Sequence, residues 1–224
     1  AMGGEYLGDW TDCGYAGYAA ETCDNEFEDI SATGTPAVGA CDDCGELVPI
    51  GFTFNFYGDD HTEIAIGSNG YLTFGSDWTA SVNGPIPDSA QPNEFIAPFW
   101  EDLDPSMGGT IHYYYSPDAG TFTVQFTEVP NGSAAVGGEY TFQVVLYMDG
   151  TIRFYYLDMV GYIEGATIGI ENPDGTDGVQ IPGYEAAAGV CKSICPIFDD
   201  PIVCPYLPPF DIKPGSCPNP LNTK

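Results

Sequence analysis

The feature that most constrains the fold is a run of alternating aromatic residues followed by a hairpin signature. Phe52, Phe54 and Phe56 recur at every second position, which places their side chains on one face of an extended strand. A second apolar alternation precedes Asn69-Gly70, a pair that readily supplies the positive φ angles of a type I′ turn. This stretch therefore predicts antiparallel strands with an aromatic core and a type I′ turn at Asn69-Gly70.

The same alternation of strands and turns continues along the chain. Asp149-Gly150 separates two further apolar alternations, and residues 117–120 supply a turn between two extended segments. The expected strands are 27–35, 48–57, 61–66, 71–74, 95–100, 110–115, 121–126, 140–147, 151–156, 166–170 and 179–181. About ten short strands with turns between them are typical of a β-sandwich. The sequence therefore predicts an all-β fold, an antiparallel β-sandwich.

The two ends of the chain differ from its central part. Residues 1–26 show no strand-length alternation, and residues 191–224 are dense in proline, which a central strand does not tolerate. We expect a β-sandwich domain over 27–190, a Cys-containing N-terminal arm, and a Cys- and Pro-rich C-terminal arm that runs extended. Only 183–190 shows a short helical pattern, and no apolar run is long enough to span a membrane.

The charge balance excludes several classes of partner. Lys and Arg number 4 against 33 Asp and Glu, which gives a formal net charge of −29. Such a surface repels phosphate backbones and anionic membrane surfaces, so we expect no nucleic-acid binding and no membrane insertion. The acidity favours solubility, and it also favours divalent cations, which relieve repulsion between carboxylates.

The cysteines predict an oxidising, extracellular environment. Eight of them gather near the two ends of the chain, which favours disulfides there. They are Cys13, Cys23, Cys41, Cys44, Cys191, Cys195, Cys204 and Cys217. We expect Cys13–Cys23 to close a local loop, and Cys204 with Cys217 to tie the tail. The alternative for the other four cysteines is a four-thiolate zinc site.

The sequence contains no familiar catalytic motif. His61 and His112 lie far apart in the sequence, and the metallopeptidase pattern His-Glu-x-x-His and the hydrolase pattern Gly-x-Ser-x-Gly are both absent. We expect no enzyme and no required cofactor. Asn131 opens a glycosylation sequon in a turn, for which an unmodified loop is the alternative.

One acidic group is a candidate calcium site. Glu101, Asp102 and Asp104 follow an apolar strand, and hard oxygen ligands at such spacing suit Ca²⁺, with Asp59 or Asp60 as a further ligand. A plain acidic loop is the first alternative. A pair of glycosidase carboxylates beside an aromatic wall is the second.

The order of several motifs resembles a known family. They are ISATGT (30–35), IGFTFNFYG (50–58), SNGYLTF (68–74), IAPFWEDL (96–103) and TFQVVLYMDGTIRF (141–154). This succession resembles a secreted β-sandwich module of bacteria and archaea that is similar to the extracellular domain of nidogen. The resemblance covers about residues 27–182 and implies a structural or adhesive role, in multidomain surface proteins or beside secreted peptidases. The Cys-bearing ends depart from the pattern, and residues 210–222 resemble a segment that opens a further module.

Together these features predict a secreted, non-enzymatic module at the cell surface. We expect it to self-associate, or to contact neighbouring modules of a surface protein, and to build an adhesin or fibril through its terminal arms. One alternative is that both arms wrap their own domain. Another is an accessory domain that targets a secreted hydrolase to a glycan. Its candidate stacking residues are Tyr15, Tyr18, Tyr113, Tyr115, Tyr155 and Trp78.

Overall fold

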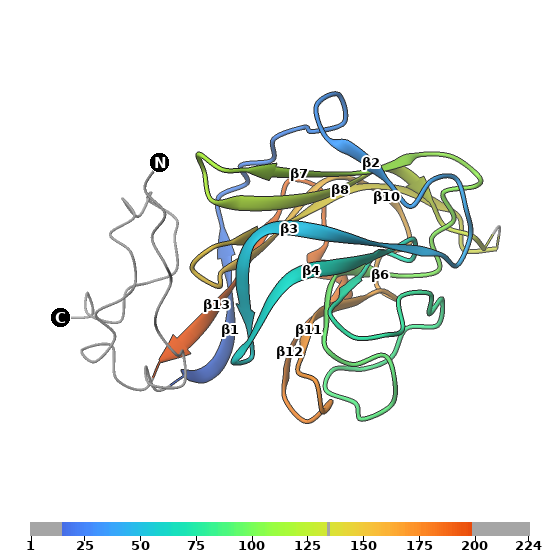
Figure 1. The fold of residues 1–224 in the computed structure, drawn as a ribbon. Coiled ribbons are helices and arrows are strands. Elements are labelled where there is room, and N and C mark those ends of the chain that lie inside the picture. Colours follow the sequence, from blue (N-terminus) through green and yellow to red (C-terminus); the bar gives the residue numbers. More distant parts are fainter. Residues whose placement is uncertain (1–14, 134, 199–224) are drawn as a thin grey trace.

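The protein is a sandwich of two antiparallel β-sheets, as the sequence predicts. Its structure is a computed structural model that describes residues 15–133 and 135–198. Within this part of the chain, thirteen strands form a seven-stranded and a six-stranded sheet that pack face to face (Figure 1). Among the described residues no helix is both long and apolar enough to cross a membrane.

The strand order differs from the order in the sequence. The seven-stranded sheet contains, from edge to edge, β1 (Tyr15–Cys23), β13 (Cys191–Phe198), β10 (Ile152–Gly161), β9 (Gly138–Tyr147), β8 (Thr121–Pro130), β7 (Thr110–Ser116) and β2 (Thr35–Ala37). The six-stranded sheet contains β12 (Gly178–Ile181), β11 (Thr167–Glu171), β6 (Phe95–Trp100), β5 (Leu72–Thr73), β4 (Asp59–Gly67) and β3 (Gly45–Phe56). The 3-10 turn η2 (Gly183–Glu185) occupies the segment with the helical pattern.

The main core lies between the two sheets and is rich in aromatic rings. Phe54 and Phe56 of β3 are completely buried, as their period-two spacing predicts. Phe126 and Phe142 stack on the facing sheet with ring centroids 4.6 Å apart. Each buried phenylalanine contributes roughly 1.5–3 kcal/mol relative to an exposed one, so these rings hold the two layers together.

The sandwich extends beyond the boundaries predicted for it. β1 lies in the expected N-terminal arm, and β13 lies between β1 and β10 rather than running free. The proline argument fails here because β10 pairs only with residues 191–194 of β13. Pro196 comes after that stretch and faces only Tyr18 of β1, so its missing N–H removes no bond to β10.

The strand predicted over 27–35 is wrong, apart from the short β2. This segment instead crosses the outer face of the seven-stranded sheet. The Ile30 amide donates to Gln125 Oε1 at 2.8 Å, and Gln143 Nε2 donates to the Glu28 carbonyl at 2.6 Å. Side chains of β8 and β9 thus replace a neighbouring strand as hydrogen-bond partners. The described part of the N-terminal end therefore wraps its own domain.

The turn at Asn69-Gly70 joins β4 to β5 but is not of type I′. Gly70 has a φ of 76°, whereas Asn69 is not among the residues with positive φ. The closing bond runs from the Gly67 amide to the Tyr71 carbonyl, which makes the connection wider than two residues. The hairpin at Asp149-Gly150 joins β9 to β10 as predicted.

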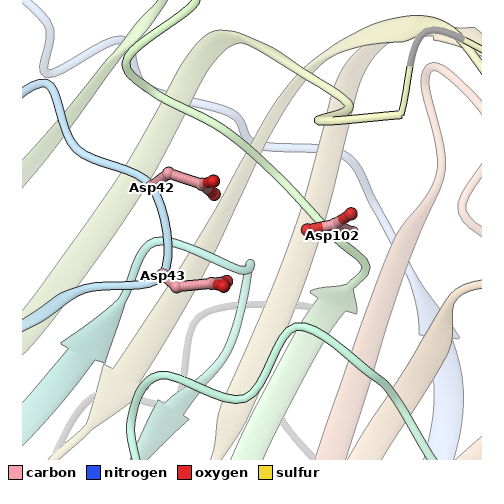
Figure 2. Close-up of side chains that lie close together, drawn as sticks. All are labelled: Asp42, Asp43 and Asp102. Carbon is pink, nitrogen blue, oxygen red and sulfur yellow. The ribbon is translucent and has the colours of Figure 1, made fainter.

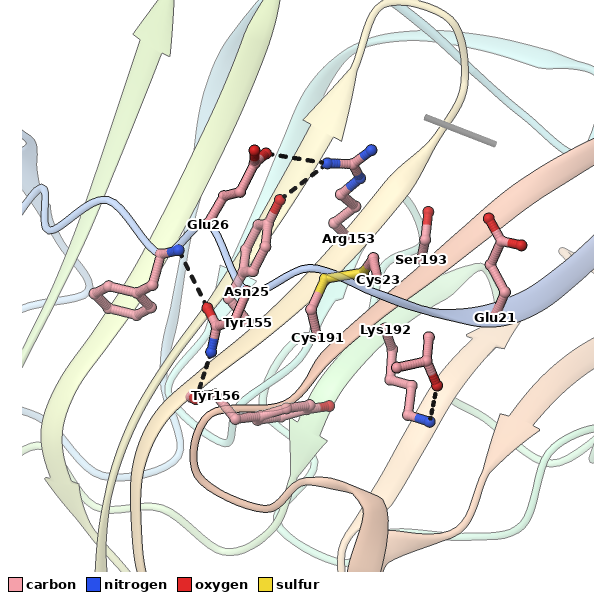
Figure 3. Close-up of a disulfide and its surroundings, with 12 residues drawn as sticks. Glu21, Cys23, Asn25, Glu26, Arg153, Tyr155, Tyr156, Cys191, Lys192 and Ser193 are labelled. Carbon is pink, nitrogen blue, oxygen red and sulfur yellow. Dashed lines mark hydrogen bonds and ion pairs between the residues drawn. A yellow bond between two sulfur atoms is a disulfide. The ribbon is translucent and has the colours of Figure 1, made fainter. Parts of the chain in front are cut away.

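The disulfides correct two predictions. Cys23 is bonded to Cys191, not to Cys13 (Figure 3). Cys41 is bonded to Cys44. The zinc alternative therefore fails, because these cysteines have no thiolates left for a metal. Cys195 is also disulfide-bonded. Cys13, Cys204 and Cys217 lie outside the described residues.

Candidate functional site

Three carboxylates come together where the loop before β3 approaches the loop after β6 (Figure 2). One ligand atom from each of Asp42, Asp43 and Asp102 lies within 4.8 Å of the others. Asp42 and Asp43 are exposed and Asp102 is half-buried. Since the two loops are far apart in the sequence, the fold creates this cluster.

A short covalent loop presents the first two carboxylates. The Cys41–Cys44 disulfide closes a loop of four residues, so Asp42 and Asp43 project from its tip. Asp43 has a φ of 45°, a left-handed conformation that aspartate tolerates better than most residues. This loop places both carboxylates toward Asp102 (Figure 2).

Buried Asn69 ties the two loops together. Its Nδ2 atom donates to Asp43 Oδ1 at 2.9 Å, and its Oδ1 atom accepts from the Leu103 amide at 3.0 Å. Its carbonyl also accepts from the Glu101 amide at 3.2 Å. Asn69 is completely buried, so these bonds hold the acidic loops in a fixed relative position.

The cluster concentrates negative charge. Partial loss of hydration is the main effect that raises the pKa of Asp42 above its usual value. The nearby carboxylates raise it as well, in the order Asp104, Asp43 and Asp102. Partial burial is also the main effect that raises the pKa of Asp102, and the negative charges of Asp43 and Asp104 add to it. The structure describes one arginine and one lysine, and both pair elsewhere: Arg153 with Glu26 and Lys192 with Glu185. Oxygen ligands at this spacing are of the kind that Ca²⁺ takes.

Of the predicted calcium ligands, only Asp102 belongs to this three-carboxylate cluster. Asp104 lies nearby, accepts a bond from the Ser106 amide at 2.8 Å, and adds to the repulsion. Glu101 turns toward Asn131, and its Oε2 atom accepts from the Asp102 amide at 3.2 Å. Asp59 and Asp60 lie on β4, where Asp60 accepts from Asn55.

Sequence reasoning missed Asp42, Asp43 and Asn69. The signal for the two aspartates was present in the Cys-Asp-Asp-Cys motif, because a disulfide-closed loop of four residues must project its middle side chains. Asn69 was interpreted only as a turn residue. Its bridging role depends on loops that no local pattern brings together.

The predicted glycosylation site Asn131 is 3 % exposed. Its Nδ2 atom lies 3.5 Å from Glu101 Oε2, and its Oδ1 atom accepts from the Ser133 amide. A glycan on this nitrogen would have to displace the contact with Glu101. The buried position therefore argues against the modification.

Several of the aromatic residues proposed for glycan stacking pack against other rings. Tyr18 contacts Tyr57 with centroids 5.0 Å apart, and Tyr115 contacts Phe52 at 6.0 Å. Tyr155 is 2 % exposed. Tyr18, Tyr115 and Tyr155 therefore form no open platform. Trp78 is half-buried, and the side chain of Tyr15 is not among the described ones.

The glycosidase alternative also lacks the required arrangement. The Trp100 indole N–H donates to the Ala80 carbonyl at 2.9 Å, beneath the proline-rich loop. The Glu101 carboxylate instead faces Asn131. The aromatic ring and the carboxylate therefore serve different parts of the structure.

Comparison with known proteins identifies the module. The NIDO-related family matches residues 17–193, which run from β1 to β13. Dendrite extension defective protein 1 of Caenorhabditis elegans is 24% identical over 166 residues, which cover 62% of this chain and 14% of that protein. The chain therefore spans a small part of this relative's length. No solved structure matches the chain.

These matches agree with the resemblance to nidogen that the sequence motifs carry. The match over 17–193 runs from within β1 to the start of β13, so it covers nearly all of the sandwich that the structure describes. The chain belongs to the NIDO-related family, and this membership, together with the disulfides, indicates a non-enzymatic extracellular module.

Proposed function

We propose that this chain is a structural and adhesive module of a cell-surface assembly, and that it keeps its fold when tension is applied through its ends. Membership of the NIDO-related family supports an extracellular structural role. The observation that carries the proposal is the covalent pairing of the first and last described strands (Figure 3).

β1 and β13 form an antiparallel pair that is closed at one end. Tyr15 lies opposite Phe198 at the open end, and Cys23 lies opposite Cys191 at the other. The disulfide joins residues 168 positions apart in the sequence. The chain thus enters and leaves the domain side by side, and a covalent bond lies just inside.

This geometry controls how the module responds to force. Tension on the two ends can open the strand pair from Tyr15 and Phe198 no further than Cys23–Cys191, and the additional disulfide of Cys195 can only shorten this opening. Residues 24–190 therefore carry no load in the oxidised protein. A link in a surface assembly needs this property, since its core must stay folded while its ends are pulled.

Further contacts fix the region around the disulfide. Lys192 Nζ pairs with Glu185 and also donates to Thr22 Oγ1 at 3.2 Å. Arg153 lies 3.6 Å from Glu26 Oε2, and Asn25 Nδ2 donates to a backbone carbonyl of β10. The contacts of Glu26 and Asn25 fasten the chain after β1 to the seven-stranded sheet (Figure 3).

We assign self-association to the terminal segments, since two of the other sheet edges, β2 and β3, are poorly suited to pairing. β2 has three residues and contains Pro36, and β3 loses its register with β4 between Pro49 and Phe54. Such interruptions discourage strand addition by another chain. The test is sedimentation velocity from micromolar to millimolar concentration, with electron microscopy of the largest species. Growth with concentration is expected, and a strict monomer at all concentrations, with or without calcium, would contradict assembly.

The second part of the proposal is that Asp42, Asp43 and Asp102 bind calcium, with Glu101 and Asp104 beside them. A bound divalent ion would offset the repulsion that raises the pKa of Asp42 and Asp102. Calcium would therefore stabilise the folded module.

Millimolar calcium chloride is expected to raise the melting temperature by about 3–5 °C over sodium chloride of equal ionic strength. An ion at about ten times its Kd adds about 1.4 kcal/mol, and 1 kcal/mol shifts Tm by about 2–4 °C in a domain of this size. Asp102→Asn should remove this difference and slightly raise Tm without calcium, because one repelling charge is gone. Asp118→Asn, in the exposed β7–β8 turn, should change neither value. Equal shifts from both salts would mean ordinary screening and no site.

A further inference from the structure

A recess lies beneath the proline-rich loop that precedes β6. Its volume is about 190 Å³. Its floor is formed by Phe95, Trp100 and Glu171, which are 1 %, 3 % and 1 % exposed. Its rim is formed by exposed residues of the loop, including Val82 and Gln91. The recess therefore opens to solvent and ends on buried side chains.

The size of the recess limits what it can take. A single water needs only about 10–15 Å³, whereas pockets for drug-sized ligands occupy about 300–1,000 Å³. The recess lies between these limits, so it suits one side chain or a ligand of similar size.

The floor carries a carboxylate with one unused oxygen. Glu171 Oε2 accepts from the Asp88 amide at 2.6 Å. Glu171 Oε1 is buried and has no hydrogen-bond partner among the described residues. Burial, with a smaller contribution from the Asp88 carboxylate on the rim, raises the pKa of Glu171 to about 7, although the hydrogen bond from the Asp88 amide acts in the opposite direction. A buried acceptor of this kind favours a ligand that brings its own donor and positive charge.

The chemistry of the recess favours an ammonium group on an alkyl chain. One free oxygen matches the compact ammonium of lysine, whereas the guanidinium of arginine is best bound by two. Phe95, Trp100 and Pro92 offer apolar surface for the methylene stem. No described basic side chain lines the recess, since Arg153 and Lys192 belong to the other sheet.

We propose that this recess binds a lysine side chain of a partner protein, with the ammonium on Glu171 Oε1 and the methylene stem against Trp100 and Phe95. This inference goes beyond the structural role and does not depend on it, because a single small probe tests it. One side chain gives weak binding, with a Kd on the order of 1 mM.

The key variant is Glu171→Gln, which keeps the shape of the side chain and removes its charge. Because the folded pKa is raised from 4.5 to about 7, the ionised carboxylate costs stability, and this loss grows as pH rises between these values. The ionisable groups that face Glu171 are the Asp88 carboxyl and, more distantly, the Tyr57 hydroxyl. Glu171→Gln is therefore expected to melt above the wild type at pH 8 and close to it at pH 4, so lost binding cannot be attributed to misfolding.

The test is an NMR titration with Nα-acetyl-lysine methylamide at pH 7.5, following the Asp88 amide and the Trp100 indole N–H. We expect saturable shifts in the wild type and binding at least tenfold weaker in Glu171→Gln. Glu139→Gln removes an equal charge from an exposed position on the other sheet and should bind like the wild type. The neutral norleucine analogue and glucose should not bind. Equal binding of norleucine, binding of glucose instead of lysine, or no saturable shift would each overturn the proposal.

Discussion

Reducing the disulfides is expected to lower the free energy of unfolding by at least about 5 kcal/mol. The Cys23–Cys191 bond closes a separation of 168 residues, and the loss of chain entropy that it imposes on the unfolded state is about 5 kcal/mol for such a loop. Domains of this kind are stable by about 5–15 kcal/mol in total, so this loss is about a third or more of the total stability. Urea unfolding followed by tryptophan fluorescence, with and without reductant, measures the difference.

The matched control removes the other described disulfide alone. Cys41→Ser/Cys44→Ser opens a separation of only 3 residues, for which the same relation gives about 2 kcal/mol. The oxidised double variant should therefore remain well folded and should still lose about 5 kcal/mol on reduction. If it were as unstable as the reduced wild type, the small acidic loop, and not the strand pair, would be the main covalent support.

Gly70→Ala is expected to destabilise the domain by about 3–4 kcal/mol. The φ of 76° costs any L-residue about 1–2 kcal/mol. A Cβ atom at this position would also lie 2.0 Å from the carbonyl oxygen of Phe99, a buried backbone atom that has no room to move away. Overpacking of this kind adds typically 1–3 kcal/mol.

A second glycine separates these two effects. Gly58 has a φ of 99°, but a Cβ atom there would meet nothing within 4 Å. Gly58→Ala should therefore cost only about 1–2 kcal/mol. Urea unfolding of both variants gives the comparison. Equal losses would mean that the Phe99 carbonyl yields and that close packing at Gly70 is unimportant.

The strands that sequence reasoning found share a visible pattern of burial. β3, β6, β9 and β10 place apolar side chains in the core at alternating or continuous positions, and this signal is local. β1 lacks it because, apart from Gly17, the side chains described along this edge strand are exposed or half-buried. Its place in the sheet comes from backbone pairing with β13 and from a disulfide. Neither of these produces a periodic pattern of apolar residues in the sequence.

The candidate site was found only in part for a similar reason. Asp102 was recognised because it follows an apolar strand. Its neighbours Asp42 and Asp43 arrive from a loop whose position depends on Asn69 and on a disulfide. Glu171 was missed as well, because a single glutamate at the end of an apolar strand looks like a strand boundary. Only the loop folded over β6 turns it into the floor of a recess.

The central claim, that the module stays closed under tension, is tested most directly by pulling a single molecule through its two ends. In oxidised protein the strand pair should open without release of residues 24–190, since Cys23–Cys191 stops the extension. After reduction the same segment should extend by a further step of about 550–600 Å, at about 3.3–3.6 Å per residue. The account predicts this long step in the reduced protein alone. A long step of the same size in the oxidised protein would contradict it.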